Sequence, residues 1–331
     1  MYQNINATNY NNCDVNSNSL NEDNILYIYT KKIPAIKSLI EALKEIFRDA
    51  SIKFTPKVTK QLEIDQTKTK VTGGMYITAL NSNSNILVRL HLEADKFCEY
   101  HCYPDNNKNF ISLGVNMSNL FKLIRFLNND DELYFLYNKS TLNQLNLQYK
   151  NKQKKLTSNY YLNLLDLPDD NIIIGKQKFD FVITMPSNDF HSLIKNMSII
   201  AEQVEIKFIN NNDNYTLTFS CNGEFASQES VFNGATNSST DGEIINVLKN
   251  EEENEDEDDD NKIIQGLYEL KALSLFSRCS SLCPTIELYI RNDSPLVIKY
   301  RVADMGSVHL ILSPINKDNE INDQSDEDSL D

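Results

Sequence analysis

The sequence predicts an α+β fold of two similar halves, each with two helices packed against antiparallel sheet. The segments that begin at Val115 and Met185 both contain Ser-Asn-x-Phe, followed by an aliphatic pair and a cation, and such a repeat indicates internal duplication. Four amphipathic segments recur at intervals of roughly 70 to 85 residues. Short strand-like runs fill the intervals, and four helices are too few for parallel strands, which need a long crossover at every connection.

The predicted helices each carry an apolar stripe with the period of an α-helix. They begin near Ile33, Ser118, Ser187 and Tyr268, and each is about three turns long. Ser118 and Ser187 stand where a hydroxyl group could cap the first turn. The inward side chains are expected to be Ile36, Leu39, Ile40 and Leu43 in the first helix, Leu120, Leu123, Ile124 and Leu127 in the second, Phe190, Leu193, Ile194 and Met197 in the third, and Leu270, Leu273 and Phe276 in the fourth.

The predicted strands are runs of alternating or β-branched residues bounded by Asn, Asp and Gly. They are residues 25–29, 75–80, 86–92, 132–137, 179–185, 204–209, 215–220, 285–290, 296–302 and 308–313.

The negative charge of the chain is concentrated in two segments. The net charge is -15, and residues 251–260 contribute -9 and residues 316–331 contribute -6, so the rest of the chain is neutral. Blocks of like charge repel themselves and stay solvated. We therefore expect disorder at about 241–262 and at 316–331, and also in the Asn-rich stretch 1–24.

The two folded halves are expected at residues 25–165 and 179–315, joined by a connector at 166–178. The connector contains Pro168 and Gly175, which suit a linker, but also three consecutive isoleucines, 172–174. An exposed apolar run of this kind needs a cover. It is either a buried strand or a segment that supplies apolar side chains to a groove for a partner.

Basic residues lie roughly opposite the apolar stripe on all four predicted helices. Such residues usually mark a solvated helix face, but quasi-equivalent helices would point them in one direction. A surface of this kind suits the phosphates of nucleic acid and binds them without sequence preference. The candidate DNA-binding residues are Lys37, Lys44, Lys122, Arg125, Lys195, Lys271 and Arg278.

Signatures of catalysis are absent from the sequence, which has four His residues and none of the common hydrolase, metalloprotease or nucleotide-binding motifs. Cys98 and Cys102, with His91 and His101 nearby, leave a zinc site conceivable, but Cys in a strand-like run is more often a small buried hydrophobe. We expect no enzyme activity, no metal and no cofactor. The sequence also has no run long enough to span a membrane and no secretory signal, which favours a reduced intracellular protein without a membrane partner.

Several blocks, in order, resemble the proliferating cell nuclear antigen family, the sliding clamps of eukaryotes and archaea. The resemblance runs from about Ile25 to Ile315 and leaves out the tails, an expansion at about 55–72 and the acidic loop. The matching blocks are IEALKEIF (40–47), GMYITALNSNSNILVRLHLEADKFCEYHC (74–102), LGVNMSNLFKLIRFLNNDDEL (113–133), LLDL (164–167), MPSNDFHSLIKNMS (185–198) and DSPLVIKYRVADMGSVHLILSP (293–314).

The resemblance implies a processivity factor that encircles duplex DNA and tethers a DNA polymerase and other replication and repair enzymes. Three copies would join head to tail through strands at about 157–165 and 225–232, with tandem clamp domains, helices lining the channel and sheets outside. A clamp loader is an implied partner. The source can be cellular or a large DNA virus, so the implied location is the nucleus or a viral replication compartment in the host cell.

The resemblance also implies a groove for a client peptide of the form Gln-x-x-aliphatic-x-x-aromatic-aromatic. Its residues would be Leu80, Leu87, Ile172, Ile174, Pro295, Ile311, Ser313 and Pro314. The sequence departs from the family at Ile311, where an aromatic residue is usual, and at Ser84 and Asn85, which replace a His and an apolar residue. A monomeric accessory factor that never forms a ring and a subunit of a mixed checkpoint-type clamp are the alternative functions.

Overall fold

The computed structural model describes residues 23–61, 69–81, 85–105, 108–168, 172, 175, 178–211, 214–235, 246–249 and 262–315. The tail expected at 1–24, apart from its last two residues, and the tail expected at 316–331 lie outside the described residues. So does most of the tract expected at 241–262. Within that tract, however, residues Asn246–Lys249 form a strand.

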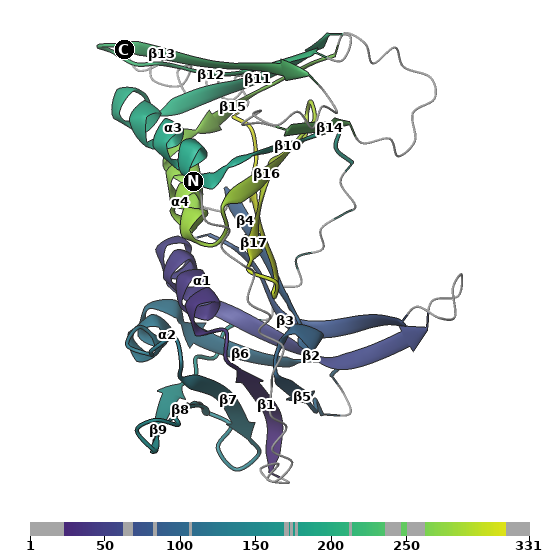
Figure 1. The fold of residues 1–331 in the computed structure, drawn as a ribbon, viewed down its shortest axis with the longest axis vertical. Coiled ribbons are helices and arrows are strands. Elements are labelled where there is room, and N and C mark those ends of the chain that lie inside the picture. The colour runs from purple at the N-terminus through teal and green to yellow at the C-terminus, as the bar shows by residue number, and fades with distance from the viewer. Residues whose placement is uncertain are drawn as a thin grey trace, which may run out of the picture.

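The two halves have the same order of elements (Figure 1), which confirms the α+β prediction of a duplicated fold. The first half contains β1 (Asn24–Thr30), α1 (Ile33–Ile46), β2 (Asp49–Gln61), β3 (Thr69–Leu80), β4 (Ile86–Glu93), η1 (Ala94–Lys96), β5 (Glu99–Cys102), β6 (Ile111–Asn116), α2 (Met117–Ile124), β7 (Glu132–Asn138), β8 (Gln144–Asn151) and β9 (Leu156–Asn163). The second contains β10 (Phe181–Pro186), α3 (Ser187–Ile200), β11 (Gln203–Asn211), β12 (Asn214–Asn222), β13 (Ser227–Ala235), β14 (Asn246–Lys249), β15 (Ile263–Glu269), α4 (Leu270–Ser277), η3 (Arg278–Ser281), β16 (Thr285–Ile290), β17 (Leu296–Val302) and β18 (Gly306–Leu312).

The sheets repeat as the elements do, and all their strand pairs are antiparallel. In the first half the orders are β5-β1-β7-β8-β9 and β4-β3-β2-β6, and in the second they are β14-β10-β16-β17-β18 and β13-β12-β11-β15. The edge strand β18 pairs with the edge strand β4, and this pairing merges two of the four sheets into one sheet of nine strands. The halves are therefore joined by main-chain hydrogen bonds as well as by side-chain packing.

The β18–β4 junction is apolar on its inner face. Val308 pairs with Leu90 and Leu310 pairs with Val88, and all four side chains are buried. At one end of the junction Gly306 pairs with Leu92 and has φ +155, a conformation that side chains disfavour. A Cβ atom on Gly306 would lie 2.0 Å from the carbonyl oxygen of His91, so the two strands approach this closely only because residue 306 is glycine.

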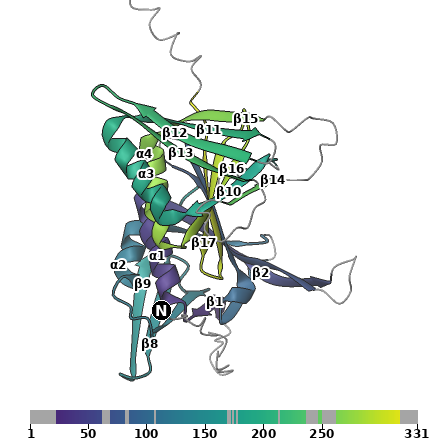
Figure 2. The ribbon, with the colours of Figure 1, turned by 45° about the horizontal axis from the view of Figure 1, so that its top comes forward.

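The helices lie together on one side of the molecule, with the nine-stranded sheet on the other (Figures 1 and 2). Their apolar stripes are buried as predicted, except that Leu123 is only half-buried. The predicted serine caps are wrong. Asn116 caps α2 by accepting a hydrogen bond from the Asn119 amide, and the Ser187 hydroxyl donates instead to the Cys283 carbonyl oxygen. Ser187 is buried at the start of α3, where the hydroxyl fixes the chain before β16.

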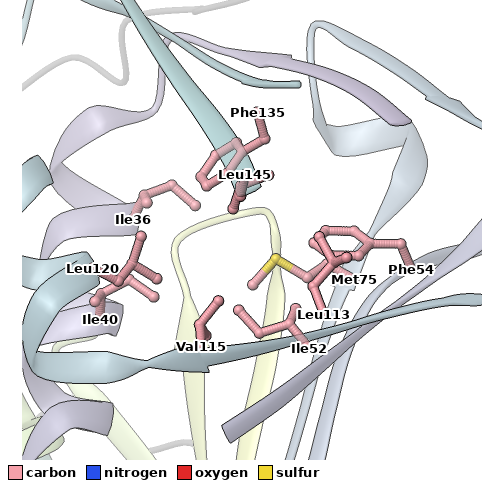
Figure 3. A pocket seen from close by; sticks show the side chains of 10 residues that line it. All are labelled: Ile36, Ile40, Ile52, Phe54, Met75, Leu113, Val115, Leu120, Phe135 and Leu145. Atoms are coloured by element: carbon pink, nitrogen blue, oxygen red, sulfur yellow. The ribbon is translucent and has the colours of Figure 1, made fainter. Parts of the chain in front are cut away.

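The core of the first half encloses one small apolar cavity (Figure 3). Its volume is about 10 Å³, and Ile36, Ile40, Met75, Phe135 and Leu145 are among the side chains around it. A space of this size can hold a single water molecule at most, and water needs polar partners that this lining lacks. The cavity is therefore a packing gap between α1, α2 and the sheet, and it is not a ligand site.

The strand-like runs in the sequence do not identify β2, β6, β8, β9, β13, β14 or β15, and β9 and β13 are expected only from the family resemblance. β2 contains Pro56 and a bulge between Thr55 and Val58, and β15 contains Gly266, so both depart from the strand pattern. Of the tract at 55–72 that the family resemblance leaves out, the described residues 55–61 and 69–72 belong to the paired ends of β2 and β3.

Replacing Gly306 with Ala should weaken the junction between the halves, because the new Cβ atom collides with main chain on β4. We expect the free energy of unfolding to fall by more than about 1 kcal/mol, measured by chemical denaturation. Gly175→Ala is the control, since nothing lies within 4 Å of a Cβ atom there. Equal stability of the two variants would contradict the proposed role of Gly306.

Candidate nucleic-acid and client-peptide interfaces

The four helices form one continuous layer in the order α2, α1, α4, α3. The Lys44 ammonium lies 4.8 Å from the centre of the Phe121 ring, which links α1 to α2. The Ser198 and Ser274 hydroxyls are 2.8 Å apart and link α3 to α4. Glu45 on α1 forms an ion pair with Arg278, which follows α4 directly, so the halves also meet within the helix layer.

All seven candidate DNA-binding residues lie in this layer or at the helix ends. Lys122, Arg125, Lys195, Lys271 and Arg278 are exposed, and Lys37 and Lys44 are half-buried. The Lys37 ammonium donates a hydrogen bond of 2.9 Å to the Leu127 carbonyl oxygen. Lys37 therefore helps to hold the end of α2 against α1, and it is the least available of the seven for a phosphate.

Glu45 is an acidic residue within the cationic layer. Its carboxylate lies 2.6 Å from the Lys44 ammonium and also pairs with Arg278. The hydrogen bond from Lys44, with further contributions from Arg278, lowers the pKa of the Glu45 carboxyl. Two of the seven candidate cations thus share one carboxylate in the free protein, which offsets part of their positive charge.

Three candidate groove residues, Leu80, Leu87 and Ile311, lie on the outer face of the nine-stranded sheet, where the halves meet. In cross-strand register Leu80 is opposite Leu87, Leu87 is opposite Ile311, and Ile311 is opposite Val297. We call these four residues the apolar row. Leu80 is 44% exposed, so the β3 end of the row is open to a partner.

Three of the other groove candidates lie near this row. Pro295 directly precedes β17, and Ser313 and Pro314 directly follow β18, so all three are near the end of the row. Ile172 is half-buried, and Ile174 lies outside the described residues. Sequence reasoning missed Val297, although the alternation of LVIKYRV places it on the same face as Lys299.

The strand β9 is the edge strand of the five-stranded sheet in the first half, and it carries exposed apolar side chains. Leu156 is 53% exposed and Tyr161 is 61% exposed. At the opposite end of the molecule (Figure 1), β13 is also an edge strand, with Val231 at 47% and Phe225 just before it at 74%. Long unprotected edges with apolar residues are sites at which further chains add.

The sequence also raised the questions of a zinc site and of a membrane span, and the described residues bear on both. Among them, no three His, Cys, Asp or Glu side chains are arranged to hold a metal ion. The Cys102 thiol is buried and donates to the Phe54 carbonyl oxygen, and burial raises its pKa to about 12, so it is an unreactive core group. Over the same part of the chain, no helix has both the length and the hydrophobicity needed to cross a membrane.

Comparison with known proteins matches both halves of the chain to domains of one protein family. Residues 29–171 match the family described as proliferating cell nuclear antigen, N-terminal domain, and residues 173–315 match its C-terminal domain. The chain is similar to a probable DNA polymerase sliding clamp 1 of Paramecium bursaria Chlorella virus 1, with 29% identity over 89% of this chain and 99% of that relative.

A second relative is the probable DNA polymerase sliding clamp of Acanthamoeba polyphaga mimivirus. It is 30% identical over 91% of this chain, and the match spans 64% of the mimivirus protein, which is longer. The duplicated sheets, the four helices in one layer and these matches agree. The chain belongs to the proliferating cell nuclear antigen family.

Proposed function

We propose that this protein is a DNA polymerase sliding clamp, which closes around duplex DNA as a ring of three copies and tethers the polymerase and other DNA-processing enzymes. The observation that carries the proposal is the repeat of sheet positions between the halves. β9 ends its five-stranded sheet as β18 ends the equivalent one, and β13 ends its four-stranded sheet as β4 does. The β18–β4 pairing inside one chain is therefore a template for β9–β13 pairing between two chains.

This template gives a definite register between copies. When the halves are aligned strand by strand, Tyr160 takes the place of Leu310 and Gln228 takes the place of Val88. The same alignment pairs Leu156 with Phe232, Ser158 with Ser230 and Leu162 with Ala226 of the next copy. Pairing in this way covers both exposed edges and is head to tail, so repetition closes a ring when the rotation permits.

The helix layer would then form the inner wall of the ring. Exposed Lys and Arg side chains on that wall neutralise phosphates without reading bases, so the ring can move along the duplex. The apolar row lies on the opposite face, where a client peptide remains accessible while DNA fills the channel. Tethering keeps a polymerase at high effective concentration beside the primer end.

In this function the protein catalyses no reaction of its own, since it holds other enzymes on their substrate. A clamp loader would open the ring and place it on DNA. The proposed place of action is the site of DNA replication, either the nucleus or a viral replication compartment, and the viral origin of both relatives favours the second.

The ring can be tested by native mass in solution. The chain has a mass of 38.0 kDa, so sedimentation should give three times this value for the wild type. Leu156→Asp should weaken assembly about tenfold or more, because it brings a charge opposite Phe232 of the next copy. Leu142→Asp is the control, since Leu142 is similarly exposed but lies in the turn before β8. A wild-type monomer would favour an accessory factor that forms no ring.

Binding of DNA by the helix layer can be tested by salt dependence. Lys195→Ala should lower the slope of log K against log salt concentration by about 1, because one fewer phosphate is neutralised, with no change in sequence preference. Fluorescence anisotropy with a linear duplex measures this slope. Lys57→Ala is the control, because Lys57 is exposed on β2 and belongs to no helix. Equal slopes for both variants would place the DNA elsewhere.

Glu45→Gln should have the opposite effect to removal of a lysine. It frees Lys44 and Arg278 from their shared carboxylate, so we expect nonspecific duplex affinity to rise by about two- to fivefold and the salt slope to steepen. The same anisotropy titration measures both quantities. Glu224→Gln serves as control, since Glu224 is exposed beside β13 and not in the helix layer. Unchanged or weaker binding by Glu45→Gln would refute the role assigned to this pair.

A further inference from the structure

The apolar row is bordered by a second row on the same face of the sheet. Two residues further along each strand, the cross-strand partners are Arg89, His309, Lys299 and Glu287, in that order from β4 to β16. Residues two apart on a strand point to the same face and lie roughly 7 Å apart. We call Arg89, His309 and Lys299, together with Arg301 one step beyond, the basic row.

Positive charge exceeds negative charge in and beside the basic row. Among the described residues Glu287 is the acid that faces it, and its carboxylate lies 2.7 Å from the Lys299 ammonium and 3.2 Å from the Arg301 guanidinium. Arg89 is exposed and forms no ion pair with any residue in the described part of the chain. A chain with net charge -15 thus presents an excess of cations beside its apolar row.

His309 lies between Arg89 and Lys299 in the register and is half-buried. Burial, then Lys299 and Arg89, lower the pKa of the imidazole to about 4, and Glu287 opposes them only in part. The imidazole is therefore neutral at pH 7, and the positive charge of the basic row comes from its Lys and Arg residues.

Beyond the basic row the sheet surface is hollow in the second half. A volume of about 650 Å³ lies among Val182, Thr184, Leu248, Lys299 and Arg301. This is within the range of sites that hold a small ligand or a few side chains.

The equivalent surface of the first half is filled by the chain itself. Tyr27 and Tyr29 on β1 take the places of Val182 and Thr184 on β10, and both are 4% exposed. Tyr29 stacks on Tyr134 with the ring centres 4.6 Å apart. In the described part of the chain, the smaller residues of β10 leave this space unfilled in the second half.

We propose that the client peptides of this clamp carry acidic residues beside their apolar anchors, and that these carboxylates bind Arg89 and Lys299 on the way to the hollow. This inference rests on the proposed function, since it assumes that clients occupy the apolar row. Beyond that function, the inference states that the charge of the flanking residues determines which client peptides bind more tightly. An uncharged or basic flank leaves Arg89 without a partner or repels it, whereas an acidic flank pairs with it.

The test uses the full chain and two synthetic peptides with identical Gln-x-x-aliphatic-x-x-aromatic-aromatic anchors. One has a flank of Asp and Glu, and the other has Ser and Gln at the same positions. Calorimetry should show the acidic peptide binding about 5- to 10-fold tighter, with an advantage that falls as salt rises. Arg89→Gln should remove most of this advantage without changing the affinity of the uncharged peptide, and Arg89→Glu should reverse the preference. Lys57→Gln, elsewhere in the same sheet, should change neither.

Three outcomes would overturn the inference. The first is equal binding of both peptides to the wild type, which leaves the clamp function intact. The second is an acidic advantage that appears only after deletion of residues 316–331, because the basic row would then belong to the acidic tail of the chain itself. The third is failure of both peptides to bind, which would refute the client groove and the inference with it.

Discussion

The structure depends on one antiparallel strand pair, β18 with β4. Each half has a five-stranded and a four-stranded sheet, and this pair joins one sheet from each half. It fixes the halves at one angle, so that all four helices lie on the same side and the apolar row runs unbroken from β3 to β17. Both proposed interfaces are therefore consequences of the same junction. A different pairing of the halves would separate the helix cations and divide the row.

Charge is distributed so that the two faces of the molecule have different partners. The helix layer carries exposed Lys and Arg, moderated by Glu45, and in the proposed function these side chains meet a polyanion whose sequence does not matter. The outer face combines apolar side chains with a few cations in fixed register, which suits a short peptide in one orientation. The two acidic segments, residues 251–260 and 316–331, account for the whole net charge, and neither contains a residue named for the helix layer or the outer face. Net charge alone would have argued against DNA, and only its location along the chain removes that objection.

The sequence was sufficient to predict the helices, the duplication and most strands, because each apolar stripe is long and regular. It was insufficient where local patterns are weak. Pro56 and Gly266 interrupt β2 and β15, and tertiary pairing overrides those interruptions. Asn116, one residue before α2, caps that helix, and no sequence pattern distinguishes it from Ser118 as a cap. The Ser187 hydroxyl donates to the carbonyl oxygen of Cys283, 96 positions away, which local sequence cannot reveal. For the site, the helix cations could be found from spacing, but the pairing of Glu45 with Arg278 spans 233 positions and needs coordinates.

The duplicated strands are matched in position but not in chemistry. Within the chain, Val308 and Leu310 meet Leu90 and Val88 on the inner face of the seam. In the proposed ring, the corresponding side chains are Ser158 and Tyr160 against Ser230 and Gln228, so the centre of the contact between copies buries less hydrocarbon than the centre of the β18–β4 contact within each copy. A force that opens the ring would therefore separate the copies at the polar β9–β13 contact, while the β18–β4 contact within each copy stays intact. Circular DNA has no free end, so it would have to enter the ring through an opened contact between copies. The polar residues Ser158, Ser230 and Gln228 would make that contact the place where the ring opens.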